Sequence, residues 1–176
     1  PYLVSSGISL AEQGADFIAI PCVTAQYFYK DLEERIPRPV MHLVAGLIEE
    51  IKGKGIHKVG VLATNGTIQS GILQSQLIEA GIDVILPDQA GQDSLMDIIY
   101  NQIKAGKSVK LEQFLTIGNE LIAKGAERVI LGCTELSLIK RDHPLDNTYI
   151  DVLDILARNA VIYSGAPLKQ EYQSLV

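Results

Sequence analysis

The sequence predicts an α/β fold, in which parallel strands are flanked by helices. Helical patterns and short apolar runs alternate along the 176 residues, which is typical of strand–helix–strand units. Glycine-containing turns separate most of these units. In addition, one segment that ends in a cysteine occurs twice, which suggests two related halves.

The duplicated segment contains the only two cysteines. The first copy runs from Gly14 through an apolar stretch to Cys22, and the second runs from Gly125 to Cys133. If each copy is a helix end, a turn and a buried strand, both cysteines leave the carboxyl ends of parallel strands. Open α/β sheets bind ligands at that edge. We therefore expect two thiols that face one substrate from opposite sides.

The first part of the chain predicts a helix at 3–13 that ends at Gly14, where a helix C-cap belongs. A strand at 17–21 follows, then a helix that Thr24 caps and that Pro37 and Pro39 stop. The pattern continues with an extended piece at 40–43, a helix to about Lys52 and a strand at 58–63.

The second part repeats this alternation. We expect a helix at 68–79, a strand at 83–86, a loop at 87–93, a helix from Ser94, a helix at 109–124, a strand at 128–131, a short strand at 149–151 and a helix at 152–163. The two cysteine segments lie far apart with a βαβα stretch between them. We therefore place one α/β lobe at 40–148, and assign 1–39 and 149–176 to an incomplete first lobe, with the site in the cleft between them.

The composition of the chain excludes several classes of function. A formal charge of −6 provides no basic stripe for nucleic acid, so a small-molecule partner is expected. No apolar run is long enough for a membrane helix, and no leader pattern opens the chain, which makes the cytoplasm the expected location. The cysteine spacing fits no metal or CxxC redox motif, so we interpret both as free thiols and expect no metal.

Paired thiols suit a specific reaction. A helix N-terminus tunes a thiol toward thiolate, and a helix is expected to begin close after Cys22 and after Cys133. One thiolate can remove a proton from a carbon acid while the opposing thiol returns a proton to the other face, without a cofactor. The alternative is that each cysteine is a small buried hydrophobic residue.

At this level of detail the sequence resembles the aspartate/glutamate racemase family, in its aspartate racemase branch. Four stretches carry the resemblance, in the same order along nearly the whole chain: 14–25 with the first cysteine, 61–71, 98–107, and 130–136 with the second cysteine. The resemblance implies two similar α/β lobes, an active site in the cleft, a pyridoxal-phosphate-independent isomerase and a homodimer.

The resemblance also implies roles for single residues. Cys22 and Cys133 would be the acid/base thiols, and the substrate-binding residues would be Val23, Thr24, Thr67, Lys104, Thr134 and Glu135. From the residues alone, Thr24 and Thr67 are equally well helix caps, and Lys104 is equally well a solvated charge. Glu135 either orients the site or caps a helix.

Three departures from the family pattern keep alternatives open. Val23 stands where the family usually has Asn, Gln26 stands where it commonly has His, and nothing corresponds to the family's opening strands. We therefore also consider a chain truncated at its N-terminus, and a catalytically inactive protein that binds a dicarboxylate or amino acid. A decarboxylase or another isomerase that uses one cysteine is a further option, whereas thiol redox chemistry is disfavoured because no resolving cysteine lies nearby.

Overall fold

The computed structural model describes residues 2–170, and its centre is a four-stranded parallel sheet. The strands are β1 (Lys58–Leu62), β2 (Asp83–Ile85), β3 (Arg128–Leu131) and β4 (Tyr149–Asp151), in the spatial order β2-β1-β3-β4. Every neighbouring pair is parallel. The α/β class predicted from the alternation of patterns is therefore confirmed.

Helices connect and cover the strands. The α-helices are α1 (Tyr2–Glu12), α2 (Tyr29–Arg35), α3 (Leu43–Gly53), α4 (Asn65–Ser70), α5 (Ile72–Glu79), α6 (Gln89–Asp97), α7 (Leu111–Ala123), α8 (Thr134–Asp142) and α9 (Val152–Tyr163). A 3₁₀ helix, η1 (Thr24–Phe28), precedes α2, and a π-helix, η2 (Ile98–Ile103), follows α6. No helix in the described range 2–170 is long and apolar enough to cross a membrane.

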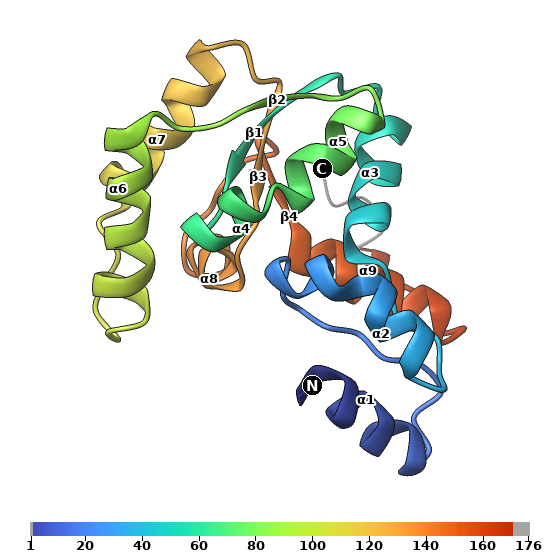
Figure 1. Ribbon diagram of the computed structural model, residues 1–176. Helices are drawn as coiled ribbons and strands as arrows, with labels where there is room; N and C mark the ends of the chain where they lie inside the picture. Colours follow the sequence, from blue (N-terminus) through green and yellow to red (C-terminus); the bar gives the residue numbers. More distant parts are fainter. Residues whose placement is uncertain (1, 171–176) are drawn as a thin grey trace.

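The sheet has a separate core on each face. On β1, Val59 and Val61 face the layer of α3, α5 and α9, whereas Leu62 faces the layer of α6, α7 and α8. This is the alternation that a pleated strand imposes. Figure 1 shows α6 and α7 on one side of the sheet and α3 and α5 on the other. Because both faces are covered, β1 and β3 are almost entirely apolar.

The N-terminal part has its own small cluster, formed by Val4, Ile18, Leu32, Ile36 and Val40. The strand expected at 17–21 is wrong: only an isolated bridge between Ile18 and Val40 forms. The bridge has two hydrogen bonds, from Ile18 N to Pro39 O and from Met41 N to Ile18 O, both 2.8 Å. Pro21 and Pro39 lack the amide N–H that a longer ladder needs.

Several helix bounds differ from the expectation. The helix expected at 68–79 is two helices, because Gly71 adopts φ +67° between α4 and α5. The loop expected at 87–93 contains the start of α6, where the Asp88 carboxylate accepts a hydrogen bond from Gly91 N at 2.8 Å. The helix expected from Thr24 begins as η1, and Thr24 does not cap it.

The last strand, β4, joins the sheet, and the last helix, α9, packs beside it. Tyr149, Ile150 and Asp151 pair with β3, and α9 packs against α3. Residues 149–163 therefore pack together with the segment 40–148. The division into 40–148 and 1–39 with 149–176, in which 171–176 lie outside the described residues, stays a prediction.

Candidate active site

The Cys133 thiol lies at the carboxyl end of β3, at the edge where ligands bind in parallel sheets. Gly132 leaves the strand with its amide donating to Leu62 O at 2.7 Å, and Cys133 then occupies the N-cap of α8. A Cβ on Gly132 would lie 3.1 Å from both Leu62 O and the Ala63 Cβ, so a glycine allows this close passage. The predicted position of Cys133 between a strand and a helix is thus confirmed.

Glu135 connects the thiol to a cation. The Cys133 Sγ donates a hydrogen bond to Glu135 Oε2 at 2.7 Å, and the Thr134 hydroxyl donates to the same oxygen at 3.3 Å. The other oxygen, Oε1, lies 3.2 Å from Lys104 Nζ. Lys104 follows the π-helix η2, so η2 and the start of α8 meet at Glu135. Four of the predicted site residues therefore lie together.

The electrostatics of this group are dominated by Glu135. Burial, and then the hydrogen bond to the Glu135 carboxylate, raise the pKa of the Cys133 thiol to about 12. Burial alone would raise the pKa of Glu135, but the hydrogen bonds from Cys133, the backbone and Lys104 lower it overall. The same carboxylate raises the pKa of Lys104, first by its hydrogen bond and then by its charge.

These shifts correct one expectation. We expected the N-terminus of α8 to favour the thiolate of Cys133, but burial and the Glu135 carboxylate raise its pKa by more than the Glu135 backbone amide and the Lys104 charge lower it. The thiol of Cys133 is therefore protonated at neutral pH. At Cys22 no α-helix begins, because the short 3₁₀ helix η1 starts two residues later.

The Cys22 segment presents different surroundings. Cys22 is exposed, and its amide donates to Ile20 O at 2.8 Å. Val23 is only 3% exposed and packs in the same core as Leu43 and Val44, so its side chain offers no free surface to a ligand. The role of Val23 in substrate binding stays a prediction.

A hydroxyl pair joins the Cys22 segment to the sheet. The Thr24 and Thr67 hydroxyl oxygens are 2.7 Å apart, and Thr67 is 1% exposed. Thr67 also lies 3.2 Å from the Thr64 hydroxyl, and Thr64 caps α4 by accepting a hydrogen bond from Thr67 N at 3.4 Å. The capping role that the residues alone allowed for Thr67 is thus held by Thr64.

The Thr24–Thr67 hydroxyl pair and the group around Cys133 lie at the same edge of the sheet. β1 and β3 are neighbours with Leu62 opposite Leu131, and Thr64 and Cys133 each follow two residues later. Thr64 begins the α4 segment to which Thr24 is bonded, while Cys133 begins α8. The structure therefore brings the two cysteine-containing segments to adjacent strand ends, although they are not symmetric.

Sequence reasoning missed the contacts that three residues make. Thr64 has the helix-start pattern of a cap residue, which the polar loop before α4 signalled. Gln26 is 1% exposed, and its Oε1 accepts a hydrogen bond from Leu43 N at 3.1 Å, tying η1 to the start of α3. Tyr100 places its ring 4.7 Å from Lys104 Nζ. The sequence marked Gln26 only as a departure from the His common in the family, and nothing in it signalled that this side chain is buried.

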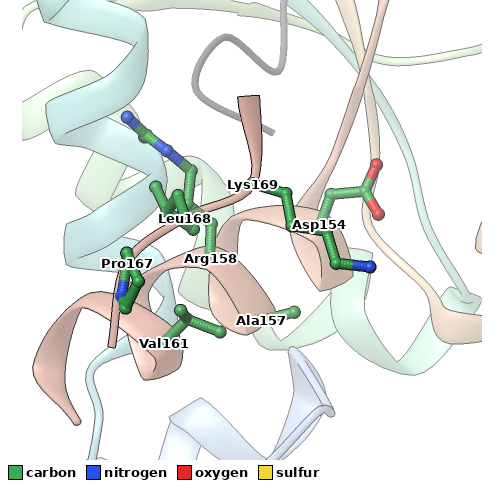
Figure 2. Close-up of a pocket in the computed structure, with 7 residues that line it drawn as sticks. All are labelled: Asp154, Ala157, Arg158, Val161, Pro167, Leu168 and Lys169. Atoms are coloured by element: carbon green, nitrogen blue, oxygen red, sulfur yellow. The ribbon is translucent and has the colours of Figure 1, made fainter. Parts of the chain in front are cut away.

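A hollow of about 310 Å³ lies elsewhere, between α9 and the segment that follows it (Figure 2). It is lined by Asp154, Ala157, Arg158, Val161, Pro167, Leu168 and Lys169, and none of the predicted site residues lines it. Arg158 pairs with Glu50 of α3 at 2.8 Å. Within residues 2–170, no cluster of three or more His, Cys, Asp or Glu side chains is arranged to hold a metal.

Comparison with known proteins identifies the family. Residues 1–160 match the family model described as Asp/Glu/Hydantoin racemase. The chain belongs to this family. Curated relatives include the broad specificity amino-acid racemase RacX of Bacillus subtilis, 31% identical over 161 residues that cover 90% of this chain and 69% of RacX. The glutamate racemase of Corynebacterium glutamicum is 28% identical, over 87% of this chain and 60% of that protein.

A solved structure supports both fold and family. The aspartate racemase of Picrophilus torridus superposes with a TM-score of 0.79 at 26% identity, covering 96% of this chain and 71% of the other. The resemblance seen in the cysteine motifs is thus confirmed at the level of the family. The three relatives are named for different specificities, so the family alone does not select a substrate.

Proposed function

We propose that this chain racemises an acidic amino acid, aspartate before glutamate, without a cofactor, using Cys22 and Cys133 as its two acid/base thiols. One observation carries the proposal: the hydroxyl pair of Thr24 and Thr67 ties the Cys22 segment to the end of β1, next to the strand that ends at Cys133. Two thiols on opposite sides of one carbon are what inversion by proton transfer requires.

The surroundings of the thiols suggest which acts first. Cys133 is the protonated partner, because burial and Glu135 hold its proton. In this direction of the reaction Cys22 accepts the Cα proton, and the electron pair of the Cα–H bond is delocalised into the substrate's carboxylate. The Cys133 S–H bond then breaks, and its proton goes to the opposite face of Cα. Cys22 ends protonated and Cys133 ends as thiolate, which is the form needed for the reverse direction.

Lys104 is the feature that favours an acidic substrate. Its side chain is 44% exposed, although its ammonium is paired with Glu135, so one side of the cation remains open to an anion. Ammonium groups bind carboxylates by charge-assisted hydrogen bonds. The expected homodimer and the acidic amino-acid substrate belong to this proposal as well.

The proposed reaction can be tested by measuring exchange of the Cα proton with solvent. In deuterated buffer, the protein should incorporate solvent deuterium at Cα of L-aspartate or D-aspartate as optical purity is lost. Cys22→Ser and Cys133→Ser should each abolish racemisation while the circular dichroism spectrum stays that of the parent. Retained racemisation in both variants would exclude the two-thiol mechanism.

A second candidate is a protein that binds a dicarboxylate without turnover. It is favoured by the burial of Val23, because an apolar side chain in the core cannot replace the hydrogen bonds of the Asn usual in the family. Calorimetric binding of aspartate, without deuterium exchange at Cα under any tested pH, would support this candidate against the racemase.

A further inference from the structure

Lys104 lies between an aromatic ring and a carboxylate. Its Nζ is 4.7 Å from the centre of the Tyr100 ring and 3.2 Å from Glu135 Oε1. Glu135 in turn accepts the Cys133 thiol hydrogen bond at 2.7 Å. Ring, ammonium, carboxylate and thiol therefore form one continuous line of contacts that ends at a reacting atom.

Tyr100 and Lys104 are presented by an unusual turn. The Lys104 amide donates to Ile99 O, five residues back, at 3.0 Å, which is the spacing of the π-helix η2. Single π turns inside α-helical segments occur frequently at functional sites. Here the wide turn fixes the backbone from which both side chains project.

A buried amide holds this turn in place. Gln102 is 5% exposed, and its Nε2 donates to Asp97 Oδ2 and to Gln113 Oε1, both at 2.9 Å. Its Oε1 accepts from Lys110 N at 2.8 Å. These paired polar groups hold the backbone of the turn, from which Tyr100 and Lys104 both project.

The ring and the carboxylate affect Lys104 differently. Glu135 attracts the ammonium and also neutralises it, whereas an aromatic face attracts a cation without contributing a negative charge. Tyr100 is 48% exposed, and within residues 2–170 its ring belongs to none of the aromatic pairs. Its ring instead contacts the Lys104 ammonium beside the site.

We propose that Tyr100 is a positioning residue that holds the Lys104 ammonium ready for the side-chain carboxylate of a dicarboxylic substrate, and so sets the preference for acidic amino acids. The inference rests on the proposed function, because it assigns Lys104 to the substrate. Tyr100 itself takes no part in proton transfer. Its effect is on substrate binding, through the position of the Lys104 ammonium.

The test compares two ligands of equal length in four proteins. Succinate has two carboxylates and butyrate has one, so the difference between their affinities measures the contribution of the second carboxylate, which the proposal assigns to Lys104. In Tyr100→Leu, which keeps apolar bulk and loses the ring, succinate should bind about 2- to 5-fold more weakly, and butyrate should bind as in the parent. Tyr100→Phe, which keeps the ring, should restore succinate binding. Tyr163→Leu removes another exposed aromatic ring and serves as the control.

Kinetics provide a second readout. For aspartate, Tyr100→Leu should raise KM by the same factor and leave kcat close to that of the parent. A merely structural role would instead lower kcat or weaken the binding of both succinate and butyrate. Equal succinate affinity in Tyr100→Leu, Tyr100→Phe and the parent would overturn the assignment, even if aspartate is racemised. Ring-dependent succinate binding in a protein that shows no racemisation would refute the proposed reaction and uphold the role of Tyr100.

Discussion

Thr24 and Thr67 are 43 residues apart in the sequence, yet their hydroxyl oxygens lie 2.7 Å from each other. One residue is two positions after Cys22, and the other is in the first turn of α4, directly after β1. This pair is the direct link between the Cys22 segment and the edge of the sheet. Substituting one of the two residues can therefore distinguish an effect on the position of Cys22 from an effect on the stability of the fold.

Thr67→Val should reduce racemisation far more than it reduces stability. A single net hydrogen bond contributes about 1 kcal/mol to the free energy of unfolding. A small displacement of a reacting group, by contrast, can cost on the order of 100-fold in rate. Urea denaturation and deuterium exchange at Cα measure the two effects. Thr116→Val is the control, because its hydroxyl donates only to Glu112 O within an exposed turn of α7. A rate loss no larger than that of the control would contradict a positioning role for Thr67.

Glu135→Gln should lower the pKa of the Cys133 thiol. The variant removes the carboxylate, whose hydrogen bond and charge both raise this pKa, but leaves the burial that is the larger cause. The pKa should therefore fall from about 12 and remain above its ordinary value. In a Cys22→Ser background Cys133 is the only thiol, so the pH dependence of its alkylation by iodoacetamide reports its titration, because the thiolate is the nucleophile. Glu112→Gln, on the exposed side of α7, should leave the titration of Cys133 unchanged. An equal shift in both variants would contradict the direct effect.

The sequence was sufficient to predict the parallel sheet and the place of Cys133, because apolar runs such as β3 are buried on both faces and leave a strong pattern. It was misleading for 17–21, where the apolar pattern equals that of β3 but no full partner strand forms. The apolar pattern of a segment does not show which other segment will lie beside it and pair with it. For the same reason, the matching cysteine spacing predicted a symmetry that the structure does not have.

The electrostatics of the site could not be predicted either. The partner of Cys133 is only two residues away, but its effect depends on the rotamer that places Glu135 Oε2 against the thiol. Lys104 reaches the same carboxylate from a π-helix, and a helical periodicity of 3.6 residues does not reveal that wider turn. Side-chain direction and local helix type are decided by tertiary packing.

Gly71→Ala should destabilise the protein through the backbone alone. Gly71 has φ +67°, and a Cβ built on it meets nothing within 4 Å, so steric overlap plays no part. A non-glycine residue in this left-handed region costs about 1–2 kcal/mol. Gly66→Ala is a matched control in α4, because a Cβ there is equally free and alanine favours a helix by about 1 kcal/mol. Urea denaturation should therefore shift in opposite directions in the two variants, and a loss in both would point to a cause other than φ.

Asp151→Asn should leave the protein at least as stable as the parent at neutral pH, and Asp151→Ala should destabilise it. Asp151 is 3% exposed, its Oδ1 accepts hydrogen bonds from the Ser137 hydroxyl at 2.7 Å and from Leu153 N at 2.9 Å, and it caps α9. Asparagine keeps an acceptor oxygen in that place, whereas alanine loses the cap at a cost of about 1–2 kcal/mol.

The direction of the pKa shift of Asp151 predicts whether its contribution to the free energy of unfolding rises or falls with pH. Burial, the largest cause, raises its pKa above the ordinary 3.8, although the hydrogen bonds from Ser137 and Leu153 oppose the shift. A carboxyl whose pKa is raised by folding contributes stability that is present below pH 3.8 and is lost as the pH rises through the higher folded value. The free energy of unfolding of the parent, relative to Asp151→Asn, should therefore decrease across this window and then level off. A relative stability that rises with pH there would show that the hydrogen bonds outweigh burial at Asp151.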